Sequence, residues 1–205
     1  MKILLSDAGK RYNREWIFRH LTYEFNTGNA YAITGNNGSG KSTLLQVIAG
    51  AVQHNEGKVD FLLDGTSIEP EQHHRHLSIA APYLELPEEM TLTEVLDFHQ
   101  SFKPFLSSVT IASIIDILGL KQAAHKQIRY YSSGMKQRVK LAQAIFSDVP
   151  AVLLDEPCSN LDTEGIALYH QLIQNYGGRR LLIISSNDEQ EYSFCNEKLS
   201  VTNYK

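Results

Sequence analysis

Short apolar runs along the chain alternate with stretches whose apolar residues recur at helical spacing. The runs 30–34, 151–154 and 181–185 are continuous and rich in β-formers, which is typical of strands buried on both faces of a parallel sheet. The segments 42–50 and 165–176 instead have the period of amphipathic helices. Strand, helix and strand in succession predict an α/β fold.

The middle of the chain has a different pattern of apolar residues. Apolar residues recur at helical spacing over 93–103 and again over 109–118, with no strand-like run between them. Segment 58–63, which ends at an Asp-Gly turn, predicts one arm of an antiparallel ribbon. We therefore expect an α/β core with a mainly parallel sheet, an antiparallel β subdomain and a helical subdomain inserted at roughly residues 82–145, all in one domain over 1–205.

Composition and charge narrow the classes of function. Of 205 residues, 42% are hydrophobic and 20% charged, which is ordinary for a chain with one sizeable core. The apolar runs are far shorter than the roughly 18 residues of a membrane span, and the first residues lack the apolar region of a secretory signal. A net charge of −4 argues against a nucleic-acid partner. Two distant cysteines, Cys158 and Cys195, are too few for a disulfide framework, so we expect a reducing cytoplasm.

Residues 35–42, GNNGSGKS, fit the pattern G-x-x-x-x-G-K-[ST] of a phosphate loop and lie between a predicted strand and a predicted helix. The glycines let successive backbone N–H groups point into one concavity, and the helix N-terminus adds positive potential. We expect Lys41 to bind the β- and γ-phosphates and Ser42 to ligate Mg²⁺. The predicted nucleotide-binding residues are Gly35, Asn36, Asn37, Gly38, Ser39, Gly40, Lys41, Ser42 and Thr43.

A second acidic site follows the apolar run 151–154. Asp155 and Glu156 emerge at the C-terminal end of this predicted strand, where ligands bind in open α/β sheets. Asp155 is suited to hold Mg²⁺, and Glu156 is suited to polarise an attacking water. Taken alone, the two acids could equally end a strand and begin a turn at Pro157. The phosphate loop upstream favours the catalytic interpretation.

These motifs together resemble the nucleotide-binding domain of the ATP-binding cassette (ABC) family, a class of P-loop NTPases, over essentially the whole chain. Residues 131–138, YSSGMKQR, resemble the LSGGQ signature and its helix, and 159–162, SNLD, resemble the D-loop. Tyr12 stands where the family has an aromatic residue that stacks on adenine. The resemblance implies that the signature binds the γ-phosphate of ATP held by a second cassette, in a head-to-tail dimer. The residues implied are Ser132, Ser133, Gly134 and Met135 of the signature and Asp162 of the D-loop.

Three features depart from the family pattern. Asn187 stands where the family has a histidine near the γ-phosphate, and an amide cannot carry a proton. Pro82 stands where the family has the glutamine of its Q-loop. The signature has Ser133 and Met135 in place of Gly and Gln. Because the residues needed to bind Mg·ATP are retained, we expect a Mg²⁺-dependent ATPase that is slow or depends on a partner. Its candidate catalytic residues are Glu156, Lys41 and Asn187.

The resemblance implies an ATP-hydrolysing transporter subunit with two kinds of partner: a second cassette, in a homodimer or a heterodimer, and a membrane-spanning permease. Such a subunit is expected in the cytoplasm, at the cytoplasmic face of the inner or plasma membrane. Two other functions stay open. One is a degenerate or regulatory ATP-binding cassette with little turnover of its own. The other is a cytosolic ABC protein that acts on ribosomes or DNA, although the chain has neither paired cassettes nor a long coiled-coil insertion.

Overall fold

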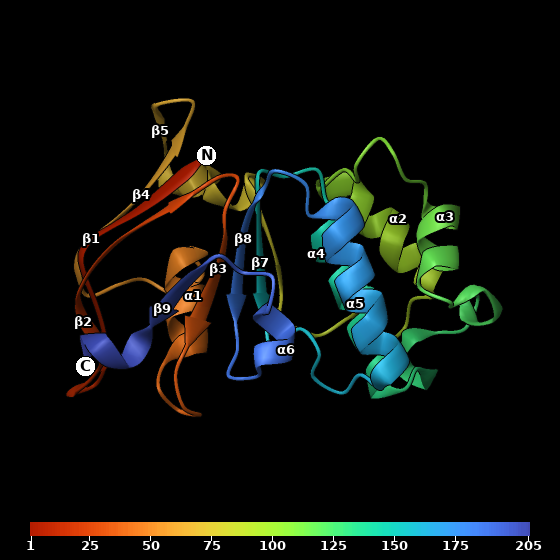
Figure 1. Cartoon of the computed structure of the whole chain (residues 1–205). Helices are drawn as coiled ribbons and strands as arrows, with labels where there is room; N and C mark the ends of the chain where they lie inside the picture. Colours follow the sequence, from red (N-terminus) through yellow and green to blue (C-terminus); the bar gives the residue numbers. More distant parts are fainter. The chain divides into compact units, whose positions relative to one another are not determined.

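The computed structural model describes all residues 1–205, and the chain divides into two compact units. The first unit is built mainly on β-sheets and the second on helices (Figure 1). The first comprises Met1–Ile79, Val149–Glu156 and Arg179–Lys205, and the second comprises Ala80–Asp148 and Pro157–Gly178. The prediction of one cassette over 1–205, with a helical subdomain at 82–145, stays a prediction.

The first unit begins with an antiparallel sheet of strand order β2-β1-β4-β5. Strands β1 and β2 form a long hairpin whose register shifts around Ala8 and Lys10, and Asp7, which lies within the first shift, has a φ of +51°. Such irregularities are β-bulges, which increase the twist of a strand. The strands are β1 (Lys2–Tyr12), β2 (Glu15–Asn26), β4 (Glu56–Leu63) and β5 (Thr66–Ile68). The predicted antiparallel subdomain is therefore confirmed.

The other sheet of this unit has strand order β6-β7-β8-β3-β9. Strand β3 pairs in parallel with β8 and with β9, and β7 pairs in parallel with β8. Every residue of β7 and β8 is buried, which explains why their sequences are continuous apolar runs rather than alternating ones. The strands are β3 (Ala30–Thr34), β6 (Leu77–Ala80), β7 (Ala151–Asp155), β8 (Leu181–Ser185) and β9 (Glu197–Ser200).

The core of the first unit is one apolar cluster that draws on both sheets and on helix α1 (Lys41–Ile48). The ring of Phe25 packs edge-on against Tyr31, with 4.9 Å between the ring centroids. Each fully buried side chain of this size contributes about 1.5–3 kcal/mol through removal of apolar surface from water. The unit also contains α6 (Glu189–Tyr192) and two short 3₁₀ helices, η1 (Pro70–Arg75) and η4 (Val201–Tyr204).

The second unit is helical, and its helices are coloured from yellow-green to light blue in Figure 1. Helix α2 begins at a capping box in which Thr91 Oγ1 accepts from Glu94 N and the Glu94 carboxylate accepts from Thr91 N. Thr110 and Ser113 cap α3 in the same way. Its helices are α2 (Leu92–Phe102), α3 (Ile111–Ile117), α4 (Ser133–Phe146) and α5 (Thr163–Tyr176), with 3₁₀ helices η2 (Lys121–Ala123) and η3 (Ile128–Tyr130).

The predicted element types are confirmed, and the differences lie at helix ends. Helix α1 stops at Ile48 because Gly50 adopts a φ of +72° and its N–H donates to Val47 O at 3.1 Å, which closes the helix. Helix α5 begins before residue 165 because the Asp162 carboxylate accepts a hydrogen bond from Gly165 N and so caps an earlier turn. No helix is both long enough and apolar enough to cross a membrane.

Candidate functional site

The phosphate loop, residues 35–42, connects β3 to α1. Gly40 lies directly before the helix with a φ of +101°, and a Cβ added there would lie 2.2 Å from Ile17 Cγ2. Only glycine satisfies both the backbone angle and the close approach of β2. The loop thus turns into α1 so that the first N–H groups of the helix, which have no intrahelical acceptors, point back toward it.

Lys41 is held across this loop by the loop's own carbonyl groups. The side chain is 5% exposed, and its Nζ donates to Gly35 O at 2.9 Å and to Asn36 O at 3.3 Å. An ammonium group has three N–H donors, so one remains for a ligand. Ser39 Oγ is also buried in the loop and has no hydrogen-bond partner. A bound phosphate would provide acceptors for both groups.

Asp155 ends β7 as a buried carboxylate, only 1% exposed. Its Oδ1 accepts a hydrogen bond from Ser185 Oγ at 2.6 Å, which comes from the end of the neighbouring β8. Burial raises the pKa of Asp155, while hydrogen bonds from Ser185 and Ser42 act in the opposite direction, as does the charge of Lys41. A carboxylate and a hydroxyl are oxygen ligands of the kind that Mg²⁺ prefers, and a divalent cation would offset the cost of burying the charge. Ser42 and Asp155 therefore fit a Mg²⁺ site.

Glu156 follows Asp155 but has a different environment. Its backbone adopts a φ of +42°, which is uncommon for a residue with a side chain, and its N–H donates to Ser185 O at 2.8 Å. The Glu156 side chain lines a cavity of about 270 Å³ together with residues of the phosphate loop. The cavity is lined by Ile17, Asn37, Gly38, Gly40, Lys41, Ser42, Thr43 and Glu156.

Asn187 lies beside the phosphate loop. Its Nδ2 donates to Asn37 Oδ1 at 3.1 Å. Tyr12, in contrast, does not line the cavity; it is 48% exposed near the tip of the β1–β2 hairpin, and Lys10 Nζ lies 4.8 Å from the centroid of its ring. The structure thus brings together the predicted phosphate, metal and water-polarising residues, and leaves the predicted adenine platform open to solvent.

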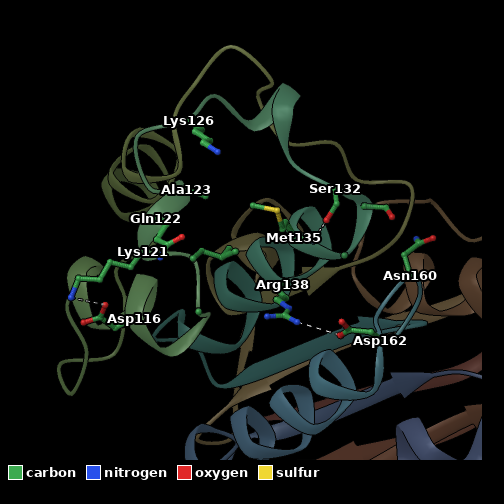
Figure 2. Close-up of a pocket in the computed structure, with 14 residues that line it drawn as sticks. Asp116, Lys121, Gln122, Ala123, Lys126, Ser132, Met135, Arg138, Asn160 and Asp162 are labelled. Atoms are coloured by element: carbon green, nitrogen blue, oxygen red, sulfur yellow. Dashed lines mark hydrogen bonds and ion pairs between the residues drawn. The ribbon is translucent and has the colours of Figure 1, made fainter.

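The signature residues occupy the start of α4 in the second unit. Ser132 is the N-cap, and its Oγ accepts from Met135 N at 3.2 Å, which leaves the hydroxyl proton free to donate. A Cβ on Gly134 would lie 3.0 Å from Asn160 O, so the D-loop backbone approaches the signature closely at this position. Ser132, Ser133, Gly134 and Met135 all line a pocket of about 880 Å³, which Figure 2 shows in close-up.

Asp162 of the D-loop lies on the same pocket and is already engaged. Its Oδ1 accepts from Gly165 N at 2.8 Å as the cap of α5, and Arg138 Nη2 lies 3.3 Å from the same oxygen. The backbone hydrogen bond from Gly165, followed by the charge and hydrogen bond of Arg138, lowers the pKa of Asp162. The carboxylate therefore stays charged and fixes the D-loop to α4 and α5.

Sequence reasoning missed three residues that position the predicted site. Ser185 holds Asp155, as described above. Gln137 is 2% exposed within α4 and donates from Nε2 to Pro157 O at 2.8 Å, while Arg138 holds Asp162. A signal was present, because polar residues at the end of an apolar strand and on the buried face of a helix need partners. What the sequence did not reveal was the identity of those partners.

The backbone around Pro82 is held by hydrogen bonds from a lysine of α4. Lys140 on α4 donates from Nζ to Pro82 O at 2.9 Å and to Ala81 O at 3.4 Å. Partial burial lowers the pKa of Lys140. Pro82 has no side-chain donor, so the backbone of this segment is held through its carbonyl oxygens by a cation from α4.

Comparison with known proteins places the chain in a family. The family model described as "ABC transporter" matches residues 18–159, and the chain belongs to this ABC transporter family. The uncharacterized ABC transporter ATP-binding protein YybJ of Bacillus subtilis is 30% identical over 200 residues, which cover 94% of this chain and 88% of YybJ. The cytochrome c biogenesis ATP-binding export protein CcmA of Agrobacterium fabrum is 29% identical over 196 residues, covering 92% of this chain and 90% of CcmA.

Solved structures agree on the fold. A putative ABC transporter ATP-binding protein from Pyrococcus furiosus superposes with a TM-score of 0.83 at 21% identity over all of both chains. A bacterial ABC transporter cassette solved as a dimer gives a TM-score of 0.81 at 20% identity, covering 97% of this chain and 94% of that one. The α/β fold with its parallel and antiparallel sheets is thus that of an ABC ATPase cassette.

Proposed function

We propose that this chain binds and hydrolyses ATP as the nucleotide-binding subunit of an ABC transporter and energises transport through separate membrane subunits. The observation that carries the proposal is the cavity at the phosphate loop. It brings Lys41 and Ser42 together with Glu156, although more than a hundred residues separate them in the sequence. A cation, a metal-binding hydroxyl and a carboxylate around one small cavity suit phosphoryl transfer to water.

Each residue has a role in this proposal. The loop N–H groups and Lys41 bind the phosphates, and Ser42 and Asp155 hold Mg²⁺, which supplies charge neutralisation at the β- and γ-phosphates. Ser185 keeps Asp155 oriented through its 2.6 Å hydrogen bond. Glu156 polarises the attacking water, because its side chain reaches the cavity without being buried like Asp155. Tyr12 stacks on the adenine.

The active form requires a second cassette in this proposal. A cavity of about 270 Å³ is smaller than a typical ligand pocket, so part of the nucleotide stays exposed on one chain. The signature of another chain covers it, with the free hydroxyl proton of Ser132 donated to the γ-phosphate. The similar bacterial cassette that was solved as a dimer supports this arrangement.

The membrane partner is a permease at the cytoplasmic face of the membrane. The matched relatives include proteins named for export in cytochrome c biogenesis, which supports a role in a membrane exporter. A second candidate is a regulatory cassette with little turnover. The contact between Asn187 and Asn37 favours it, because an amide at this position cannot transfer a proton.

Steady-state ATP turnover of the purified chain with Mg²⁺ tests the proposal, with Glu156→Gln as the matched control. We expect the parent to hydrolyse ATP and Glu156→Gln to be about 10²–10⁴-fold slower while still binding ATP. Turnover of the parent equal to that of the control would reject the enzyme and leave the regulatory cassette. Failure of both proteins to bind ATP would reject the nucleotide site altogether.

A further inference from the structure

The pocket beside the signature contains a lysine without a partner. Five charged residues line it, three basic and two acidic, and both acids are already paired. Lys121 Nζ lies 3.4 Å from Asp116 Oδ1, and Arg138 Nη2 lies 3.3 Å from Asp162 Oδ1. Lys126 is the remaining cation, and its ammonium group makes no hydrogen bond or ion pair in the structure. The pocket therefore has one uncompensated positive charge.

The position of Lys126 is set by the backbone around it. It lies between η2 and η3, and its N–H donates to Ala123 O at 2.9 Å, which closes the turn. In Figure 2 the amino end of Lys126 points toward the side of the pocket where Ser132 and Met135 lie. The free hydroxyl proton of Ser132 and the ammonium group of Lys126 are thus donors to the same space.

The side chains that line the phosphate-loop cavity, unlike those of this pocket, carry no excess positive charge. The cavity's one cation, Lys41, is accompanied by the carboxylate of Glu156, so the charged side chains that line the cavity sum to zero. A nucleoside triphosphate bound there has several negative charges, of which Lys41 and the Mg²⁺ of the proposed function together offset only a part. A lysine is well suited to add to this as a point charge, since it needs no fixed bidentate geometry.

We propose that Lys126 binds the phosphate chain of a nucleotide carried by the phosphate loop of a second copy of this chain. The inference rests on the proposed function, because it requires a nucleotide at one chain and the signature of another. It adds to that function a specific cation outside the motif residues. Lys126 thereby makes association of the two chains depend on the charge of the nucleotide.

ATP-dependent dimerisation tests the inference in full-length protein bearing Glu156→Gln, which prevents loss of ATP by turnover. The fraction of dimer is measured by size-exclusion chromatography with light scattering over a range of ATP concentrations at low salt. We expect Lys126→Met to raise the ATP concentration for half-maximal dimerisation about five- to tenfold, the effect of removing one charge pair close to water. Lys121→Met is the matched control, because that lysine lines the same pocket but is paired with Asp116.

A second measurement separates a phosphate contact from a contact with protein. The rate of release of fluorescent N-methylanthraniloyl-ATP from the dimer is expected to rise in Lys126→Met and to stay unchanged in Lys121→Met. Unchanged release with weaker dimerisation would overturn the inference, because Lys126 would then contact the other chain itself. Equal effects of the two variants would overturn it as well. Absence of any ATP-dependent dimer in the Glu156→Gln parent would instead reject the proposed function on which the inference rests.

Discussion

Asn187 Nδ2 donates a hydrogen bond to Asn37 Oδ1 at 3.1 Å, which ties the segment that follows β8 to the phosphate loop. The two residues lie 150 positions apart in the sequence. An amide at position 187 can hold the loop by this contact, but it has no nitrogen that titrates near neutral pH. The side chain therefore orients its neighbour and does not exchange a proton with the reacting groups.

Replacing Asn187 with histidine is expected to accelerate ATP hydrolysis. An imidazole retains a donor for Asn37 and adds a group that titrates near neutral pH, and general acid–base assistance commonly contributes about 10²–10⁴-fold. Since the imidazole is placed without optimised neighbours, we expect a gain of about tenfold in kcat. A phosphate-release assay over pH 6–9 measures both the gain and the new pH dependence.

The control for this substitution is Asn187→Ala, which removes the contact with Asn37 without adding a titratable group. Its turnover is expected to equal or fall below that of the parent. Equal rates for Asn187→His and the parent across the whole pH range would contradict the assignment of position 187 to the reaction.

Asp155→Asn is expected to stabilise the nucleotide-free protein while removing its response to Mg²⁺. Burial raises the pKa of Asp155 in the folded chain, so folding favours its protonated form. The protonated carboxyl group therefore adds to the free energy of unfolding below the unfolded pKa of about 3.9. This contribution is lost as pH rises through the folded pKa, so at pH 7 the buried charge lowers the free energy of unfolding. The amide keeps the acceptor for Ser185 and removes the charge. We expect a rise of about 2–4 °C in Tm at pH 7.

Differential scanning fluorimetry with and without Mg·ATP measures both parts of this prediction. The parent is expected to gain stability when Mg·ATP is added, and Asp155→Asn is expected to lose the part of that gain that depends on Mg²⁺. Ser185→Ala serves as the opposite control, because it leaves the buried charge with one hydrogen bond fewer and lowers Tm. A Tm for Asp155→Asn below that of the parent, without nucleotide, would contradict the argument.

The parts of the fold that the sequence predicted are those encoded locally. Strands β7 and β8 were evident because both faces of each are buried, so every position except the terminal Asp155 and Ser185 is apolar. The phosphate loop was evident because its backbone geometry requires glycines at fixed spacing. Helix ends were less certain, because Gly50 and Asp162 each fix an end through a single hydrogen bond.

The remaining parts depend on contacts between distant segments. Gln137 donates a hydrogen bond to the backbone carbonyl of Pro157. Every residue has such a carbonyl group, so no sequence pattern identifies the one that is bound. Asn37 and Asn187 meet only because β3 and β8 are adjacent in the sheet. The charge balance around Lys126 depends on which residues line the pocket and which of them form ion pairs, and only the structure shows this. Local chemistry was therefore predictable, and the network that positions it was not.

His99 is a partly buried imidazole in the second unit. Its Nε2 lies 2.9 Å from Ser147 Oγ, and its ring stacks on Phe105 with 5.2 Å between centroids. Ser147 Oγ donates to Gln143 O at 2.5 Å, so the Ser147 oxygen is the acceptor and Nε2 of His99 carries the proton. Burial, and to a smaller extent the charge of Lys103, lowers the pKa of His99 from 6.5 to about 4.

This lowered pKa predicts a specific loss of stability in acid. The stability contributed by neutral His99 is fully present above the unfolded pKa of 6.5 and is lost as pH falls toward the folded value of about 4. The loss amounts to about 3 kcal/mol over this window. We expect His99→Phe, which keeps an aromatic ring and cannot titrate, to flatten the pH dependence of the free energy of unfolding by that amount between pH 6.5 and 4. Urea unfolding at several pH values measures it, with His125→Gln at an exposed position as the control; parallel pH curves for His99→Phe and the parent would show that His99 is not the group that titrates.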